Sequence, residues 1–229
     1  VDEFITSSQT NKNATTVAEM TANAEALVGD FYSVEDYATG NNSGVLFFKV
    51  VAAATGTADG GKYIDHDTLS LQFQANFPGH IDPKFYGSVG DGATTDTTTF
   101  MAAYAYAGTN GIRFQVPGGT FKGKFTFDGT AAVFGAGMRQ TIFTPSDTAW
   151  CVRMFGTGND AFAAQLQDCT IQGANTGIGL ECGDAGAASS FSNGRLENME
   201  IIGFATNWNI SQATMCSFKH VYSYGTTST

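Results

Sequence analysis

The sequence predicts an all-β protein, most of it built as a solenoid in which similar turns of chain stack on one another. Short stretches of alternating apolar and polar residues recur, separated by Gly, Asn and Asp, and Gly alone contributes 28 of the 229 residues. A weak internal repeat marks the last third of the chain, and solenoid units bury their apolar faces only by stacking. One short helix precedes the repeats, where an open stack needs its first edge covered.

The sequence predicts an N-terminal helical segment over residues 1–30. Val17, Met20, Ala24 and Leu27 recur at the intervals of an a/d stripe, and Gly29 ends the pattern. The stripe is shorter than a confident coiled coil requires. Two interpretations stay open: a helix docked on its own domain, or a trimerisation helix at a threefold axis.

Residues 31–81 predict a small β domain. Gly44–Val51 is apolar at nearly every position, which indicates a strand buried on both faces. Asp59–Gly61 is a turn signal, and Leu69–Phe73 alternates apolar and polar residues as a half-buried strand does.

The helix at the start of the solenoid has clear limits. Asp96 is a good candidate N-cap, because its carboxylate can accept a free backbone N–H. Thr97–Ala107 then predicts one helix, which Gly108 and Asn110–Gly111 end. Its apolar side is formed by Phe100, Tyr104 and Ala107. A strand over 112–116 and a turn at Pro117–Gly119 follow.

The repeat lies in three similar segments, 166–173, 196–203 and, more loosely, 218–225, which begin 30 and 22 residues apart. We assign the longer interval to an insertion at Asp184–Ser190, whose residues are small. Chance similarity of such short segments is the alternative. The chain ends after a strand without a capping element, so we expect further coils beyond residue 229.

Two motifs resemble a known family. The segments YGSVGDGATTDTT (86–98) and VPGGTF (116–121) resemble the opening of the pectate-lyase-like right-handed β-helix domain of bacteriophage tailspikes. The chain departs from that pattern at Thr95, where Asp is commoner, and at Phe121, where Tyr is frequent. The segments TVAEMTANAEALVGD, SGVLFFKV and TADGGKYID, in this order, resemble the linker module that precedes the β-helix in many tailspikes.

The resemblance implies an architecture and a role. It implies an N-terminal helical or trimerisation segment (1–30), a small β linker or head-proximal domain (31–81) and the start of a parallel β-helix (82–229). It also implies a homotrimer in the virion, assembled in the host cytoplasm, whose N-terminal part joins other tail or baseplate proteins. The expected partner at the other end is a bacterial surface polysaccharide, which such proteins often degrade by hydrolysis or lyase action.

Composition excludes several partners. The formal charge of −10 and the pI near 4.5 argue against binding to nucleic acid or anionic membranes, which select basic patches. No apolar run is long enough to insert into a membrane. The four cysteines (Cys151, Cys169, Cys182, Cys216) lack zinc-site spacing and are expected to be reduced core thiols. We expect no metal and no cofactor.

No strong catalytic motif is present, and the sequence assigns no catalytic or binding residue. Gly135–Gly137 is interpreted as a tight bend, and His66, His80 and His220 as structural residues. Five carboxylates are candidates either for acid–base catalysis or for an ordinary solvated acidic surface: Glu181, Glu197, Glu200, Asp160 and Asp184. Arg139, Arg153 and Arg195 would suit a lyase, but nothing in the sequence groups them. Six aromatic residues are candidates either for stacking on sugar rings or for packing in the core or between subunits: Tyr104, Tyr106, Trp150, Trp208, Tyr222 and Tyr224.

Three functional hypotheses remain. The first is a phage attachment protein whose glycan-degrading site, if it has one, lies C-terminal to this segment. The second is a free-standing pectate-lyase-like enzyme. The third is a catalytically inactive structural adhesin.

Overall fold

The computed structural model describes residues 10–155, 161–183, 191–211 and 213–225. The chain forms two compact units. Unit 1 comprises Val1–Pro78 and Lys84–Gly87, and unit 2 comprises Gly79–Pro83 and Ser88–Thr229. A short 3₁₀ helix, η1 (Pro83–Tyr86), contains one crossing between them, at Pro83–Lys84, and the last crossing follows at Gly87–Ser88.

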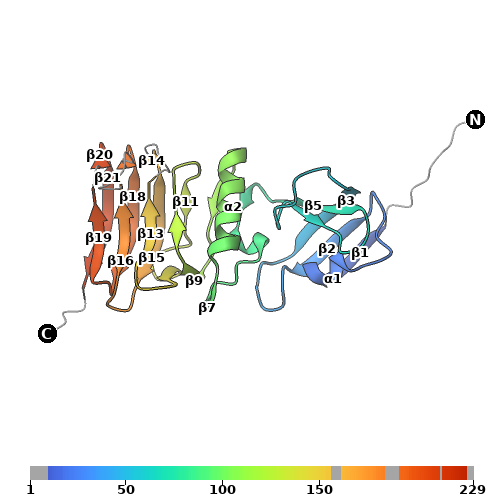
Figure 1. Ribbon diagram of the computed structural model, residues 1–229, viewed down its shortest axis with the longest axis horizontal. Coiled ribbons are helices and arrows are strands. Elements are labelled where there is room, and N and C mark those ends of the chain that lie inside the picture. The colour runs from blue at the N-terminus through green and yellow to red at the C-terminus, as the bar shows by residue number, and fades with distance from the viewer. Residues whose placement is uncertain (1–9, 156–160, 184–190, 212, 226–229) are drawn as a thin grey trace, which may run out of the picture. The chain divides into compact units, whose positions relative to one another are not determined.

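Unit 1 is a five-stranded sheet with the order β1-β2-β3-β5-β4 (Figure 1). Its strands are β1 (Asn11–Thr16), β2 (Phe31–Asp36), β3 (Leu46–Ala52), β4 (Tyr63–Asp65) and β5 (Leu71–Asn76). β1 and β2 pair in parallel, and the other pairs are antiparallel. A single helix, α1 (Val17–Thr21), contributes Met20 to a core that includes Tyr32, Phe48 and Phe73.

The prediction of a helical segment over residues 1–30 is wrong for the described residues. Residues 11–16 form a strand that pairs with β2, and the helix spans five residues only. Val17 and Met20 are buried, but Leu27 is 64% exposed and Ala24 is also exposed, so no continuous stripe exists. The chain leaves the helix after Thr21 because a loop anchored by Asp30 replaces further turns.

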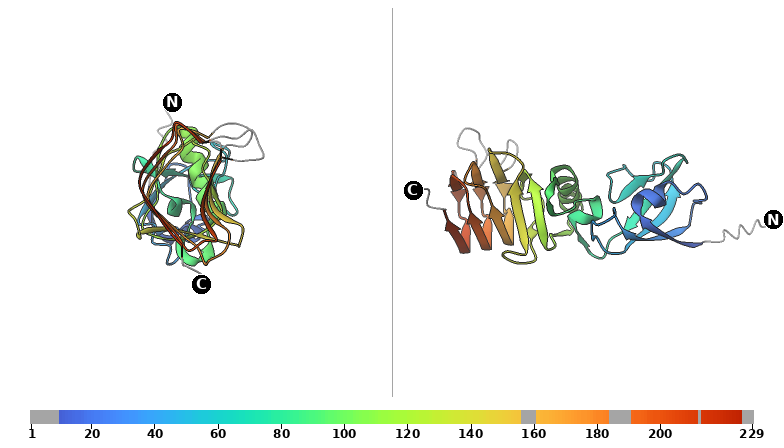
Figure 2. Two further views of the ribbon diagram at one scale, coloured as in Figure 1. Left: turned by 90° about the vertical axis from the view of Figure 1, so that its left-hand side faces the viewer. Right: turned by 90° about the horizontal axis from the view of Figure 1, so that it is seen from below.

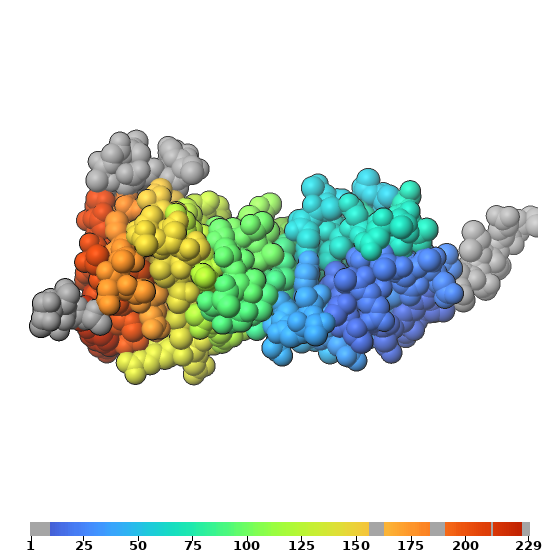
Figure 3. All heavy atoms as spheres, turned by 60° about the horizontal axis from the view of Figure 1, so that its bottom comes forward, coloured from blue at the N-terminus to red at the C-terminus, as the bar shows by residue number. Residues whose placement is uncertain are grey.

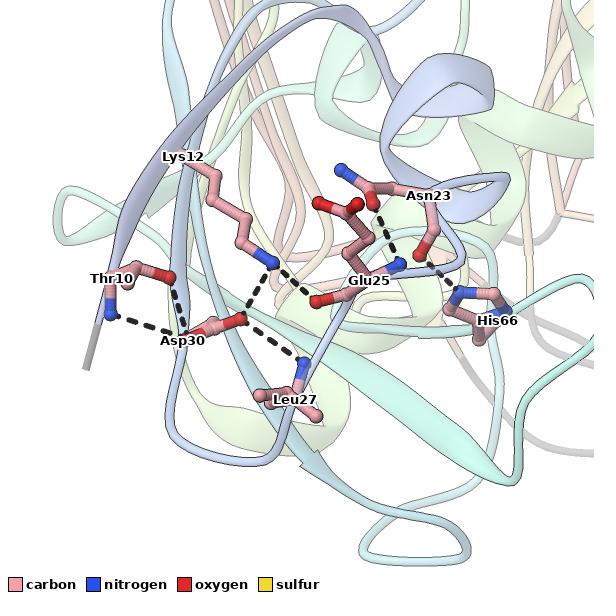
Figure 4. Close-up of polar contacts among 7 residues, drawn as sticks. All are labelled: Thr10, Lys12, Asn23, Glu25, Leu27, Asp30 and His66. Carbon is pink, nitrogen blue, oxygen red and sulfur yellow. Dashed lines mark hydrogen bonds and ion pairs between the residues drawn. The ribbon is translucent and has the colours of Figure 1, made fainter. Parts of the chain in front are cut away.

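Asp30 holds this loop through a dense set of hydrogen bonds (Figure 4). Its carboxylate accepts the backbone N–H and hydroxyl of Thr10 and the backbone N–H of Leu27, and it pairs with Lys12 Nζ at 2.9 Å. Lys12 also donates to the carbonyl of Glu25. Burial opposes ionisation of Asp30, yet the bonds from Lys12 and Thr10 lower its pKa to about 2.

Asp30 therefore makes unit 1 sensitive to acid. Because the folded-state pKa lies below the ordinary value of 3.8, this contribution is complete above about pH 4 and is lost as the pH falls through about 2. Asp30→Asn should lower the melting temperature of unit 1 at neutral pH, and the difference from wild type should shrink toward pH 2. Thermal melts followed by circular dichroism across this window measure it. A constant difference at all pH values would contradict the assignment.

The strand predicted over 44–51 is present, but the prediction that both faces are buried is wrong. In β3, Leu46, Phe48 and Val50 are buried, whereas Phe47 is 56% exposed. The strand lies between antiparallel neighbours, and one face of such a sheet need not be covered. Val45, at the same parity as Phe47, is 57% exposed.

Unit 2 begins with β6 (His80–Ile81) and β7 (Asp91–Thr95), followed by α2 (Thr97–Asn110). Gly111 ends α2 in the left-handed conformation, at φ 62°. Asp96 occupies the N-cap position, but its side chain does not cap the helix, contrary to the prediction. The carboxylate instead accepts the backbone N–H groups of Val89 (2.6 Å), Gly90 (3.3 Å) and Lys122 (3.4 Å), and burial raises its pKa. It thus fastens the glycine-rich turn to the first coil.

The rest of unit 2 is a parallel β-helix. Its further strands are β8 (Arg113–Gln115), β9 (Gly119–Gly123), β10 (Phe125–Thr126), β11 (Val133–Phe134), β12 (Thr141–Pro145), β13 (Trp150–Met154), β14 (Ala161–Phe162), β15 (Gln165–Gln172), β16 (Ile178–Cys182), β17 (Phe191–Ser192), β18 (Arg195–Ile202), β19 (Thr206–Ile210), β20 (Ala213–Thr214) and β21 (Ser217–Tyr224).

These strands stack in parallel, coil upon coil. One sheet has the order β10-β13-β16-β19, a short one has β14-β17-β20, and a larger curled sheet runs β6-β8-β11-β15-β12-β9-β7, with β18 and β21 added beyond β15. Seen along the coils, successive turns follow the same outline (Figure 2, left). The space-filling view shows the coils as consecutive layers from yellow to red (Figure 3).

The register confirms the internal repeat. Leu166 pairs with Leu196, and Leu196 pairs with Phe218, so the three similar segments occupy equivalent places in successive coils. The insertion assigned to 184–190 lies outside the described residues. The strands bend at Asp168, Asn198 and His220, which all have positive φ near 50–57°. Asn198 donates from its side-chain amide to Asp168 Oδ1 at 2.6 Å, which links two bends.

Candidate functional site

The outer face of the curled sheet carries two ladders of side chains. The register places Thr170, Glu200 and Tyr222 in one ladder and Gln172, Ile202 and Tyr224 in the other. In each coil these positions alternate with core positions such as Ile171 and Ile201, so their side chains face away from the core, although Thr170 and Glu200 are themselves shielded from solvent.

Two hollows adjoin on this face and share Tyr224. One has a volume of about 370 Å³ and is lined by Met138, Arg139, Glu200, Tyr222 and Tyr224. The other, of about 320 Å³, is lined by Gln172, Gly173, Asn175, Ile202, Gly203, Tyr224 and Gly225. We call the two together the Tyr224 groove. It combines half-exposed aromatic rings, side-chain amides and one ion pair, the mixture that binding pockets for small polar molecules typically use.

The ion pair of the groove joins Arg139 to Glu200. Arg139 donates from Nη2 to Glu200 Oε1 at 2.8 Å and from Nε to Oε2 at 3.1 Å. Tyr224 donates its hydroxyl to Oε1 at 2.7 Å, and Thr170 donates to Oε2 at 3.4 Å. Glu200 is 2% exposed, so all of these donors serve a buried carboxylate.

Electrostatics keep this carboxylate ionised. The bond from Arg139 lowers the pKa of Glu200, against the opposing effect of burial. The bond to Glu200 raises the pKa of Tyr224. Arg139 reaches its place because its own backbone has φ 64° and its N–H donates to Thr170 Oγ1 at 2.9 Å.

The structure pairs the other two candidate arginines with glutamates as well. Arg153 donates from Nε to Glu181 at 2.6 Å, and Arg195 bonds Glu197. Lys219 also pairs with Glu197, at 3.0 Å, and this bond is the main cause of the lowered pKa of Glu197. Sequence analysis left these arginines ungrouped. Parallel register is the signal that pairs Arg153 with Glu181, because they are directly opposite in neighbouring strands, whereas Arg195 and Glu197 lie on one face of the same strand.

These pairs limit what the glutamates can do chemically. A general acid in glycoside hydrolysis needs a raised pKa, whereas those of Glu197 and Glu200 are lowered. Both are therefore suited to fixed ion pairs between coils. Asp160 and Asp184 lie outside the described residues.

The candidate aromatic residues divide into three groups. Tyr222 and Tyr224 line the groove. The ring centroid of Trp150 lies 4.2 Å from the guanidinium carbon of Arg153 and 5.3 Å from Lys124 Nζ. Trp208 packs edge-on against Phe218. Tyr104 is buried, and its hydroxyl donates to Asp128 at 3.0 Å. Tyr106 lies on the same helix, α2, two residues after Tyr104.

The remaining candidates are structural. The ring of His66 accepts the N–H groups of Thr68 and Leu69 at Nδ1, and His220 stands at a bend of β21. A Cβ on Gly135 would lie 2.1 Å from the carbonyl oxygen of Asp168, so this glycine permits close stacking of coils. His80 lies in β6.

The cysteines of the described residues form no disulfides. All four cysteines are free thiols, and burial raises the pKa of Cys151, Cys169 and Cys182. Within the described ranges, no group of three or more His, Cys, Asp or Glu side chains is arranged to hold a metal ion. In the same residues, no helix has the length and apolar character needed to cross a membrane.

Comparison with known proteins identifies the fold. No protein-family model and no curated protein matches the sequence. Solved structures do match: tailspike gp49 of Acinetobacter baumannii bacteriophage Fri1, a capsular polysaccharide depolymerase (13% identity, 95% of this chain and 50% of that one, TM-score 0.66), and the gp42 tailspike of Acinetobacter phage vb_AbaP_AS12 (15%, 96% and 42%, 0.66). The enzymatically active domain of tailspike protein 4 of bacteriophage CBA120 also matches (17%, 89% and 29%, 0.66).

The chain therefore has the parallel β-helix fold of bacteriophage tailspike proteins, as the resemblance of its two motifs implies. It spans half or less of the length of each of these structures.

Proposed function

We propose that this chain is part of a bacteriophage tailspike that attaches the virion to its host by binding a bacterial surface polysaccharide. The Tyr224 groove carries the proposal, because two half-exposed tyrosines flank side-chain amides on an outer coil face. Sugar rings present apolar faces and hydroxyl edges, which such a surface complements. The tailspike-like fold supports the same role.

Degradation of the polysaccharide is proposed for the whole tailspike and not for the Tyr224 groove. The paired glutamates of the described coils favour binding over catalysis at the groove, so an active site of the whole protein would lie further along the chain. A free-standing enzyme and a catalytically inactive adhesin are the competing functions.

One experiment separates the free-standing enzyme from the two functions that need binding alone. The purified protein is incubated with capsular polysaccharides of candidate hosts, and binding is followed by biolayer interferometry and bond cleavage by release of reducing ends. Binding without cleavage favours an attachment segment or an adhesin, and cleavage by this chain alone favours the free-standing enzyme. Absence of binding to any host polysaccharide would refute the proposed function.

We further propose that the protein assembles as a homotrimer in the virion, with unit 1 supplying part of the contact between copies. The outer face of its sheet exposes Phe31, Val45 and Phe47, a group that we call the Phe47 face. Lys49 and Glu35 flank these apolar side chains with opposite charges, and a face without net charge suits self-association of a chain whose net charge is −10, because identical acidic copies repel elsewhere. Docking to other tail or baseplate proteins through the N-terminal part follows the same resemblance.

Phe47→Asp should convert the trimer into monomers, because three copies would each place a carboxylate in the contact. Native mass spectrometry or light scattering measures the mass. Ala52→Asp, which adds the same charge at the exposed far end of β3, serves as the control and should leave the trimer intact. A monomeric wild type, or a trimeric Phe47→Asp variant, would contradict the role of the Phe47 face.

A further inference from the structure

The charge pattern of the Tyr224 groove points to the kind of sugar that it accepts. Among the residues that line its two hollows, the charged ones are Arg139 and Glu200, and they neutralise each other. The groove is thus polar and aromatic without a net charge.

Arg139 is not free to bind an acidic sugar, although 76% of its side chain is exposed. Its Nε and Nη2 edge donates two parallel bonds to Glu200, so the positive charge of Arg139 is already balanced by this carboxylate. A sugar carboxylate that displaced Glu200 would leave a buried carboxylate with only Tyr224 and Thr170 as donors. Breaking a buried ion pair in this way is strongly unfavourable.

Nearby cations of the later coils are also paired with carboxylates. The outward arginines of β13 and β18, Arg153 and Arg195, are likewise held by glutamates, and Lys219 shares Glu197 with Arg195. The chain as a whole carries −10 charges, so a polyanion meets repulsion at long range.

An uncharged sugar meets none of these costs. Tyr222 and Tyr224, in the last described strand, are 46% and 49% exposed, and aromatic rings suit the apolar side of a pyranose. Gln172 is exposed beside them, and its side-chain amide suits the hydroxyl groups of a sugar.

We propose that the Tyr224 groove selects neutral sugar residues and excludes uronates and other acidic sugars. This inference rests on the proposed function, because it takes the groove to be a polysaccharide-binding surface.

A matched pair of ligands tests it. Methyl β-glucopyranoside and methyl β-glucuronopyranoside differ only in the charged carboxylate, and their binding to the protein is measured by saturation-transfer NMR at about 50 and 500 mM NaCl. We expect the neutral glycoside to bind at least about tenfold more tightly, with an affinity that does not change with salt. Tighter binding of the glucuronide, weakened by salt, would overturn the inference and leave the proposed function standing. Binding of neither ligand, or saturation transfer unaffected by Tyr224→Ala, would overturn both.

Glu200→Gln provides a second test, because it releases Arg139 and removes the buried negative charge. The variant should gain affinity for the glucuronide by about tenfold relative to wild type. Arg139→Gln combined with Glu200→Gln is the matched control and should show no gain. No gain in Glu200→Gln, with melting temperature and circular dichroism like wild type, would count against the proposal. If that variant does not fold, the wild-type comparison decides.

Discussion

Replacing Phe100 by alanine should lower the free energy of unfolding of unit 2 by about 3–5 kcal/mol. Phe100 is fully buried on the inner side of α2 and is the centre of an aromatic cluster. Its ring centroid lies 5.3 Å from that of Phe114, 5.4 Å from Phe121, 4.7 Å from Phe125 and 5.7 Å from Phe143. The loss therefore leaves a cavity bounded by rings that belong to separate strands and cannot easily collapse together.

Urea unfolding followed by tryptophan fluorescence measures this effect, because both tryptophans of the chain, Trp150 and Trp208, lie in unit 2. Met101→Ala is the control, because Met101 follows in the same helix but is only partly buried, and it should cost less than about 1 kcal/mol. A loss below about 1 kcal/mol for Phe100→Ala would show that α2 does not seal the first coils.

Replacing Tyr222 and Tyr224 together by alanine should weaken binding of the host polysaccharide by about 30-fold or more. Two aromatic side chains at the centre of a contact commonly carry about 2 kcal/mol or more of binding free energy, which corresponds to this factor. The variant also loses the hydroxyl that Tyr224 donates to Glu200, so the Arg139–Glu200 pair loses one of its fixed neighbours.

Isothermal titration calorimetry with the polysaccharide identified in the host screen measures this loss. Phe218→Ala is matched to the double variant, because Phe218 lies in the same strand β21, is 41% exposed and packs on Trp208 outside the groove. The Phe218→Ala variant perturbs the last described coil outside the groove, so its affinity for the polysaccharide should equal that of wild type. Equal losses in both variants, or no loss in the double variant, would remove the groove from the binding surface.

Features with local or periodic causes were predictable from the sequence. The start of the helix at Thr97 agrees with the prediction although the side chain of Asp96 does not cap it, and the end follows from the glycine signal, although the helix runs to Asn110 rather than Ala107. The repeat of 166–173 in 196–203 follows from stacking, which places equivalent apolar residues over each other. The motifs at 86–98 and 116–121 implied the fold that the coordinates and the comparisons show.

Features that depend on distant partners were not predictable. The a/d spacing of Val17 to Leu27 suggested a helix, but pairing of residues 11–16 with β2 and the bonds of Asp30 prevail over local spacing. Asp96 looked like a cap, yet the backbone N–H groups that it binds come from a turn and from the next coil. The groove joins Arg139 to Glu200, 61 residues apart, and no single-sequence pattern brings such positions together.

The account depends most on the parallel stacking of the last coils, and spin labels test it directly. In parallel register Arg195 lies opposite Ser217, whereas antiparallel pairing of the same segments would place it opposite Tyr224. With Cys216→Ser as background, nitroxides at 195 and 217 should show strong dipolar broadening, because neighbouring strands lie about 4.8 Å apart. Labels at 195 and 224 should show little. The reverse pattern would contradict the β-helix, and with it the Tyr224 groove and the function proposed for it.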